Sequence, residues 1–334
     1  MYCASTRLLA VVIFTVALAC NSSDRTPPFG SFEKLDAEFD QVITSDATIQ
    51  VIADSLDWCE GPLWLKSQKA LIFSDIPLNR IYKWTNAGGV EVYLEHAGYT
   101  GSIARGGETG SNGLTLDHDG RLVLCQHGDR RIARMEAPLD NPSPKFTTIA
   151  DNYQGVKFDS PNDLVFDKQG RAYFTDPPYG LEKNVEDTNK QAPYQGVYRV
   201  FNGNVQLLLD SISRPNGIAL TPDGKTLIIA NSDPSRPYWY AYDIAGNDSL
   251  TNGRIFFDAS ASPFKEKGVP DGFKISSDGY VFASGPGGIW VFNRNAKLLG
   301  RIAIPQAVSN CAFGEDEKTL FVTADDKVLR VKLR

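Results

Sequence analysis

The chain has few of the residues that hold soft metal ions. Its 334 residues include only 3 histidines and 5 cysteines, and no two cysteines form a Cys-x-x-Cys pair. A thiolate-bound zinc site is therefore not expected. The cysteines after residue 20 are Cys59, Cys125 and Cys311, which lie in or beside apolar runs typical of small buried side chains. An oxidising compartment would permit a disulfide, but an odd number leaves at least one thiol unpaired.

Further absences narrow the class of protein. Lys and Arg nowhere form a run interleaved with aromatic residues, and the formal net charge is −6, so a nucleic-acid partner is not expected. The Gly-x-Ser-x-Gly motif of serine hydrolases is absent, and no glycine-rich segment ends in the Gly-Lys-Ser/Thr of a phosphate-binding loop. No segment beyond the first 20 residues carries a sustained apolar stripe of period 3.6, which indicates little helix.

The first 20 residues are expected to form a signal peptide. Arg7 is their only charged side chain, and the apolar run from Leu8 to Leu18 is short for a bilayer span of about 20 residues. The following Ala19-Cys20 resembles a lipoprotein cleavage site, so we expect an exported protein that is either periplasmic or attached to the cell envelope by a lipid on Cys20. Residues 21–40 are polar and are expected to be a tether. Residues 41–334 are expected to form one folded domain.

One motif recurs six times along that domain. A polar residue opens a short apolar run, a turn follows, and a second apolar run leads back, as in the stretch from Ser160 to Asp176, which predicts a β-hairpin. The opening residues, 39 to 55 positions apart, are Glu60, Asn112, Asn162, Asn216, Asp271 and Asn310. Repeats of roughly 40 to 50 residues are typical of propeller blades, so the sequence predicts an all-β, six-bladed β-propeller.

The last repeat lacks an outer strand. Only one strand-like run, 327–333, follows its hairpin, whereas residues 48–54 form a strand-like run with no hairpin of their own. We expect this N-terminal strand to complete the sixth blade and close the ring, which removes free sheet edges.

The residues that open the hairpins are candidates for a metal site. The innermost strands of a propeller begin around one mouth of the central channel, so their opening side chains approach one another. Glu60, Asn162, Asn216 and Asp271 would supply only oxygen atoms, which suits a hard cation such as Ca²⁺. Asn-Gly and Asp-Gly also occur in plain turns, so each position alone is ambiguous.

Several motifs together resemble the gluconolactonase, senescence marker protein and regucalcin family from about residue 48 onward. They are Cys59-Glu-Gly-Pro-Leu-Trp64, Ser160-Pro-Asn-Asp-Leu164, Arg214-Pro-Asn-Gly-Ile218 and Val269-Pro-Asp-Gly272. The resemblance implies a six-bladed propeller that hydrolyses sugar lactones with a divalent cation in its channel. It also implies that Glu60, Asn162, Asn216 and Asp271 are the metal ligands and that Asp271 is the base. Ca²⁺ is the expected ion, with Mg²⁺, Mn²⁺ and Zn²⁺ left open.

Three further residues are expected at the substrate. Because histidine is the side chain best suited to proton transfer near neutral pH, His127 could protonate the leaving alkoxide or bind a sugar hydroxyl, or it could be an ordinary loop histidine. Asn112 resembles a ring position that faces substrate, although Asn112-Gly113 could be only a turn. Arg105 lies in the glycine-rich segment 97–110, a candidate lid over the channel, where it could hold an acidic substrate or remain a solvated loop charge.

Two other functions remain open at this point. The propeller could bind a glycan or a protein partner without turnover. It could also hydrolyse organophosphates, because the resemblance extends to the more distant diisopropyl fluorophosphatase, which shares the scaffold.

Overall fold

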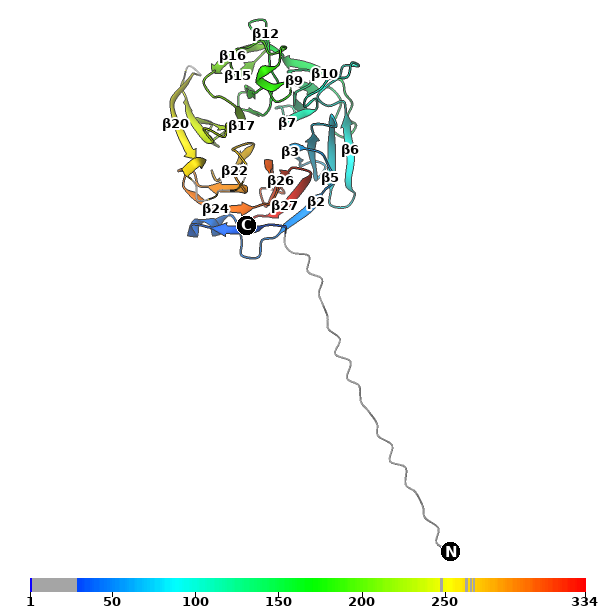
Figure 1. Ribbon diagram of the computed structural model, residues 1–334, viewed down its shortest axis with the longest axis vertical. Coiled ribbons are helices and arrows are strands. Elements are labelled where there is room, and N and C mark those ends of the chain that lie inside the picture. The colour runs from blue at the N-terminus through cyan, green and yellow to red at the C-terminus, as the bar shows by residue number, and fades with distance from the viewer. Residues whose placement is uncertain (2–28, 247–248, 262–263, 265, 267) are drawn as a thin grey trace.

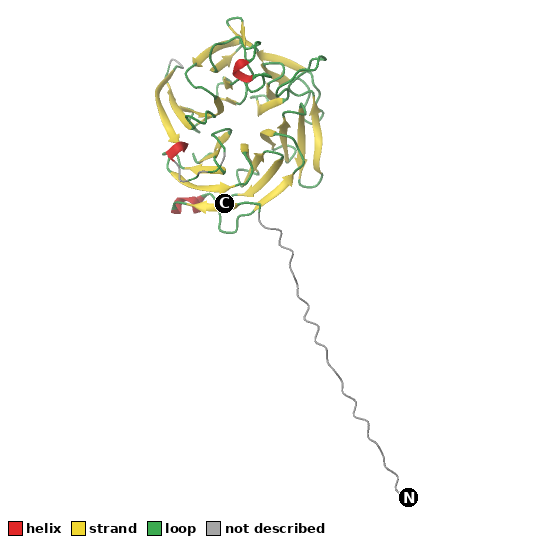
Figure 2. Cartoon of the chain, viewed as in Figure 1, coloured by secondary structure: helices red, strands yellow, loops and turns green. Residues whose placement is uncertain are grey.

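The computed structural model describes residue 1 and residues 29–334, except 247, 248, 262, 263, 265 and 267. Six antiparallel sheets are arranged in a ring around a central axis (Figure 1). Strands make up almost all of the regular structure, and the described helices are three short 3₁₀ segments (Figure 2). The predicted six-bladed β-propeller is therefore confirmed.

The first three blades follow the chain in order. Blade one contains β3 (Cys59–Leu65), β4 (Ala70–Asp75), β5 (Arg80–Thr85) and β6 (Gly89–Glu95). Blade two contains β7 (Ser111–Leu116), β8 (Leu122–Gln126), β9 (Arg131–Met135) and β10 (Phe146–Ala150). Blade three contains β13 (Leu164–Phe166), β14 (Ala172–Asp176), β15 (Gly196–Phe201) and β16 (Asn204–Leu209). In each blade the first strand is the innermost and the fourth is the outermost.

The next two blades have the same plan. Blade four contains β17 (Pro215–Leu220), β18 (Thr226–Asn231), β19 (Tyr238–Ile244) and β20 (Leu250–Asp258). Blade five contains β21 (Phe273–Ile275), β22 (Val281–Gly285), β23 (Gly288–Phe292) and β24 (Leu298–Ala303). The small elements between blades are the hairpin β11 (Asn152–Tyr153) with β12 (Val156–Lys157), and the 3₁₀ segments η2 (Asn184–Glu186) and η3 (Ala259–Ala261).

The sixth blade is built from both ends of the folded chain. Its inner strands are β25 (Val308–Gly314), β26 (Thr319–Ala324) and β27 (Lys327–Lys332), and its outermost strand is β2 (Ile49–Ala53). Ile49 pairs with Val331 in antiparallel register. The prediction that residues 48–54 complete this blade is therefore confirmed.

The predicted tether is too long. Its residues 31–40 include β1 (Ser31–Lys34), which pairs with β24 as a fifth strand of blade five, and most of η1 (Ala37–Gln41), as Figure 1 shows in dark blue. The aromatic ring of Phe39 is 2% exposed and packs into the core between blades five and six. The polar character of 21–40 concealed this because only a few apolar side chains hold the segment. The predicted signal peptide and residues 21–28 lie outside the described part of the chain, apart from Met1.

The turn inside each hairpin follows from the repeated motif. In blade three the Oδ1 atom of Asp167 accepts hydrogen bonds from the backbone N–H groups of Gln169 and Arg171, both at 2.9 Å. Gly170 then adopts a φ of +83°, where a side chain would be strained. In blade two Asp117 and Gly120 repeat the arrangement. The recurrence of one turn explains why the repeat is readable in the sequence.

Hydrophobic cores lie between neighbouring blades. Ile72 of blade one and Leu124 of blade two are both fully buried in one such cluster, and Phe282 of blade five and Val322 of blade six share another. Because the middle strands are covered on both faces, their sequences are continuous apolar runs. Cys59, Cys125 and Cys311 are buried free thiols in these cores, as expected of small hydrophobic side chains. Within the described ranges, no helix is both long and apolar enough to cross a membrane.

Candidate active site in the channel

The residues that open the innermost strands meet at one pocket, which we call the channel pocket. Its volume is about 420 Å³. Of the six hairpin-opening residues it is lined by five, namely Glu60, Asn112, Asn162, Asn216 and Asp271. All four predicted metal ligands therefore line one cavity, which is the arrangement that the repeat pattern predicts.

Local irregularities aim these side chains inward. The ladder of β3 shifts register between Glu60 and Leu63, and β7 and β17 shift at the matching points beside Asn112 and Asn216. Such bulges bend a strand and redirect its side chains. In blades three and five the opening residue lies two positions before the first paired residue, so Asn162 and Asp271 belong to the approach to the strand.

Hydrogen bonds between neighbouring blades fix the ring. The backbone N–H of Gly113 donates to the carbonyl oxygen of Asn162 at 2.8 Å, which ties blade two to blade three. The hydroxyl of Thr175 donates to the carbonyl oxygen of Asn216 at 2.7 Å, which ties blade three to blade four. With their backbones held in this way, Asn162 and Asn216 keep their side chains for the pocket.

Glu60 is a buried carboxylate, 3% exposed. The backbone N–H of Gly61 donates to its Oε2 atom at 3.0 Å, and Nδ2 of Asn310 lies 3.4 Å from the same oxygen. Burial raises the pKa of Glu60 to about 8, and the negative charges of Asp163 and Glu108 add to the rise, against the lowering effect of the Gly61 hydrogen bond. Asn310 therefore supports Glu60 and does not itself line the channel pocket.

The negative charge of Asp271 is even less favourable than that of Glu60. Burial raises its pKa well above the usual range, and the charges of Glu60, Asp163 and Glu108 raise it further. Its Oδ1 atom is buried and has no hydrogen-bond partner in the structure. Two carboxylates that oppose each other's ionisation in a confined pocket are expected to gain a cation or protons.

The pocket fits a hard cation. Its donors are two carboxylates and two amides, all offering oxygen, and Oδ1 of Asp271 has no other partner. Among the described residues no group of three or more His, Cys, Asp or Glu side chains is arranged to hold a metal. The predicted set is not such a group, because only Glu60 and Asp271 are of these residue types and the other two ligands are the amides of Asn162 and Asn216.

Asn112 lines the channel pocket, and the acceptor atom of its side chain has no hydrogen-bond partner. It is 2% exposed, and its Oδ1 atom has no hydrogen-bond partner. Its backbone carbonyl accepts a hydrogen bond of 3.0 Å from the Ser74 hydroxyl, which fixes the main chain. The position suits the predicted contact with substrate.

His127 lies behind the pocket wall. It follows β8, its side chain is fully buried, and neither ring nitrogen has a hydrogen-bond partner. Its Nδ1 atom is 3.5 Å from Oε2 of Glu108, and Glu108 does line the channel pocket. The structure thus connects His127 to the site through Glu108, a residue that sequence reasoning missed.

Arg105 is placed elsewhere. Its guanidinium donates to the carbonyl oxygens of Gly128 at 2.6 Å and Gly180 at 2.5 Å. It lines a second cavity of about 620 Å³ between the loops of blades two and three, which does not include the ring residues. Arg105 therefore braces the segment 97–110 against the loop after β14, and nothing brings it to the channel pocket.

Residues outside the hairpin-opening positions also line the pocket. Tyr179, Arg214, Trp58 and Ser232 line the channel pocket. Burial raises the pKa of Tyr179 to about 12, with a further contribution from the charge of Asp271. The guanidinium of Arg214 lies 5.9 Å from the centre of the Tyr179 ring. Trp58 and Arg214 each lie two positions before a hairpin-opening residue, so both had a nearby signal in the sequence.

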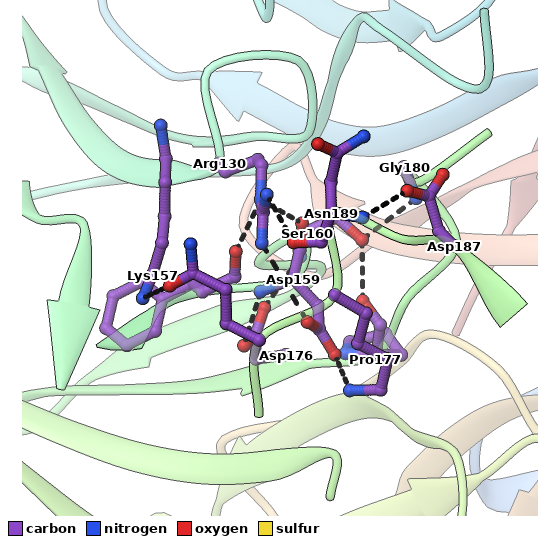
Figure 3. A network of polar contacts seen from close by, with 12 residues as sticks. Arg130, Lys157, Asp159, Ser160, Asp176, Pro177, Gly180, Asp187 and Asn189 are labelled. Carbon is purple, nitrogen blue, oxygen red and sulfur yellow. Dashed lines mark hydrogen bonds and ion pairs between the residues drawn. The ribbon is translucent and has the colours of Figure 1, made fainter. Parts of the chain in front are cut away.

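A buried polar network holds the approach to Asn162 (Figure 3). The carboxylate of Asp176 accepts hydrogen bonds from the backbone N–H groups of Asp159 at 2.9 Å and Ser160 at 2.8 Å. The side chain of Asp159 pairs with Lys190, and Arg130 donates to the carbonyl oxygens of residues 158, 159 and 189. The Ser160 hydroxyl in turn accepts from Gly180 N–H at 2.8 Å. The network therefore fixes both Asn162 and the loop that carries Tyr179.

A family model matches the chain over residues 58–326, and its description is SMP-30/Gluconolactonase/LRE-like region. The chain belongs to this family. The SMP-30/gluconolactonase assignment agrees with the resemblance found in the sequence motifs. The match covers all six hairpin-opening residues, so the channel pocket lies within it.

Individual relatives are similar over nearly the whole length. The gluconolactonase of Zymomonas mobilis is 37% identical over 325 residues, covering 95% of this chain and 90% of its own. A solved gluconolactonase from Xanthomonas campestris is 29% identical with a TM-score of 0.77, covering 91% of this chain and 95% of its own. A calcium-binding regucalcin from Agrobacterium tumefaciens is 16% identical with a TM-score of 0.65, covering 85% and 93%, and shows the fold alone.

Proposed function

We propose that the protein hydrolyses a sugar lactone to the sugar acid, with a divalent cation held in the channel pocket by Glu60, Asn162, Asn216 and Asp271. The observation that carries the proposal is that these four oxygen-bearing side chains line one cavity, in which Oδ1 of Asp271 is buried without a partner. Membership of the SMP-30/gluconolactonase family and the name of the Zymomonas mobilis relative support a lactone as the substrate.

A cation bound there would polarise the lactone carbonyl and favour ionisation of the two carboxylates. Ca²⁺ is the ion that we propose, because the donors are all oxygen and a regucalcin of the same fold is described as calcium-binding. Burial raises the pKa of Glu60 to about 8 and that of Asp271 well above its usual range, so both carboxylates would gain from a positive neighbour.

Asp271 is the proposed base. Its free oxygen accepts a proton from water as the water oxygen forms a bond to the carbonyl carbon. The bond from that carbon to the ring oxygen then breaks, and the ring oxygen takes the proton that Asp271 received, which gives a hydroxyl and restores the base. Asn112, whose Oδ1 is unpartnered, is placed to accept a hydrogen bond from a substrate hydroxyl.

The test is a pH-indicator assay with several aldonolactones, using protein treated with EDTA and protein to which Ca²⁺ has been restored. We expect acid release only from the restored protein, and a loss of at least about a hundredfold in kcat for Asp271→Asn, since general base catalysis contributes about that much or more. A thermal melt of each sample shows whether the fold is retained.

The outcomes are distinct. Folded, calcium-loaded protein that releases acid from no lactone contradicts the proposal and favours a propeller that only binds. Turnover of a fluorophosphate in place of lactones favours the organophosphate alternative.

A further inference from the structure

Glu108 is a pocket carboxylate without a role in the hydrolysis outlined above. It lies near the end of the segment 97–110, before β7, and lines the channel pocket with its side chain 40% exposed. Its charge raises the pKa of both Glu60 and Asp271, so it lies close enough to act on both. It is therefore a third negative group at the place where substrate would enter.

The Glu108 carboxylate lacks hydrogen-bond donors. Within the part of the chain that the structure describes, no residue donates a hydrogen bond to it, and the basic atom that faces it is Nδ1 of His127 at 3.5 Å. A carboxylate offers two oxygens and about four acceptor sites. Because Glu108 is 40% exposed, water fills these sites in the free pocket, and a ligand that carries hydroxyl groups can replace that water with direct, charge-assisted hydrogen bonds.

His127 is held against Glu108. The ring is fully buried, and both of its nitrogens are otherwise unpartnered. Gly180 packs against the His127 side chain so closely that a Cβ at residue 180 would lie 2.7 Å from Cβ of His127. The ring therefore has little room to move away from the carboxylate.

We propose that Glu108 selects a polyhydroxylated lactone by accepting hydrogen bonds from adjacent hydroxyls of the sugar ring, and that His127 is the positioning residue that orients it. The proposal deepens the proposed lactone hydrolysis and rests on it for the identity of the substrate. The geometry supports it because no described group of the protein donates to the acceptor sites of Glu108, and a lactone without hydroxyls has no donor to offer them.

The first experiment compares two lactones. Kinetics are measured for δ-gluconolactone and for δ-valerolactone, which has the same ring without hydroxyls, in wild-type, Glu108→Gln and Glu182→Gln. Glu182→Gln is the matched control, because Glu182 is an exposed carboxylate on the neighbouring loop that lines the second cavity and not the channel pocket.

We expect Glu108→Gln to reduce the ratio of kcat/KM for δ-gluconolactone over δ-valerolactone by about tenfold, mostly through KM, since charge-assisted hydrogen bonds are about twice as strong as neutral ones. Glu182→Gln should leave this ratio as in wild-type. An unchanged ratio in Glu108→Gln, or an equal fall in both variants, would overturn the proposal.

The second experiment measures binding without turnover. Calorimetry follows the binding of 1,5-anhydroglucitol, which has the ring hydroxyls but no carbonyl, to calcium-treated wild-type and Glu108→Gln, and separately the binding of Ca²⁺ alone. We expect about tenfold weaker binding of the polyol with calcium affinity retained. No polyol binding by wild-type, or an equal loss of calcium affinity in the variant, would overturn the proposal, the latter by making Glu108 a metal ligand.

The two experiments separate the proposals. If wild-type hydrolyses neither lactone, the proposed function fails, and the polyol measurement still decides the role of Glu108. For His127, the variants His127→Gln and His127→Gln/Glu108→Gln complete a double-mutant cycle on polyol binding, with thermal melts to confirm folding. Non-additive losses support His127 acting through Glu108, and additive losses overturn that part of the proposal.

Discussion

The surroundings of each buried carboxylate in this protein decide what that carboxylate does. Glu60 and Asp271 face each other's charge in the channel pocket, whereas Asp176 uses both oxygens to hold the backbone before Asn162. The former pair is free to take a ligand, and the latter is occupied by structure. Burial alone therefore does not mark a functional acid.

Asp176 is expected to make stability depend on pH. Burial, followed by the charge of Asp159, raises its pKa from 3.8 to about 8. The native state then binds the Asp176 proton more tightly than the unfolded state, so the contribution of this group to the free energy of unfolding falls as pH rises from about 4 to about 8, by at most about 1.4 kcal/mol per pH unit.

Urea unfolding at pH 5, 6, 7 and 8 tests this expectation. Asp176→Asn should give a shallower decline than wild-type, because an amide does not titrate. Parallel profiles for the two proteins would show that Asp176 is not the group responsible.

Among single residues, the sequence predicted most reliably those pocket positions that belong to the repeats. Glu60, Asn162, Asn216 and Asp271 could be predicted to meet because each opens a copy of one hairpin. Glu108, Tyr179 and Ser232 reach the pocket from loops or strand ends that no repeat constrains. Arg105 stood in a glycine-rich segment that suggested a lid, but the length of its side chain lets it reach two backbone carbonyls instead.

At the scale of elements, the sequence-based prediction and the structure differ most in the segment that precedes the ring, where a tether was predicted and β1 and η1 are found. β1 adds to the outer edge of blade five, and η1 follows with Phe39 inserted between blades five and six. Composition could not reveal this, because four paired residues and one buried aromatic ring are enough to hold a mostly polar stretch. The blades themselves were predictable because each apolar run is bounded by turn residues.

Phe39→Ala is expected to destabilise the protein by about 3–5 kcal/mol, the usual cost of removing a buried phenylalanine side chain. Leu35→Ala is the control, because Leu35 is 52% exposed and its loss should change stability by less than about 0.5 kcal/mol. Urea unfolding of both variants measures the difference. Equal stabilities would show that η1 contributes little to the core.

At the scale of the whole molecule, the ring is a closed set of sheets whose last blade needs strands from both ends. β2 covers β27, and the N–H of Arg334 donates to the carbonyl oxygen of Val42 at 3.0 Å. This closure could be predicted by counting strands, because the sixth repeat has one strand fewer than the other repeats and residues 48–54 supply a strand without a hairpin. The pairing register and the added fifth strand of blade five could not.

Three chains test the closure, beginning at residues 29, 48 and 55. The first retains all described elements up to the C-terminus, the second lacks β1 and η1, and the third also lacks β2. We expect the second chain to melt at a lower temperature but stay monomeric, and the third to self-associate because β27 becomes an exposed edge. Light scattering measures the association, and a monomeric third chain would contradict the expectation.

The pairing of Ile49 with Val331 also has a consequence for biosynthesis. β2 leaves the ribosome before the strands of blades one to five, whereas its partner β27 is synthesised after them, so this pairing is among the last that the ring can make. Incomplete polypeptides can form individual hairpins but cannot assemble the finished circle. A stop codon that removes β27 therefore leaves β2 without its partner and the ring open at blade six.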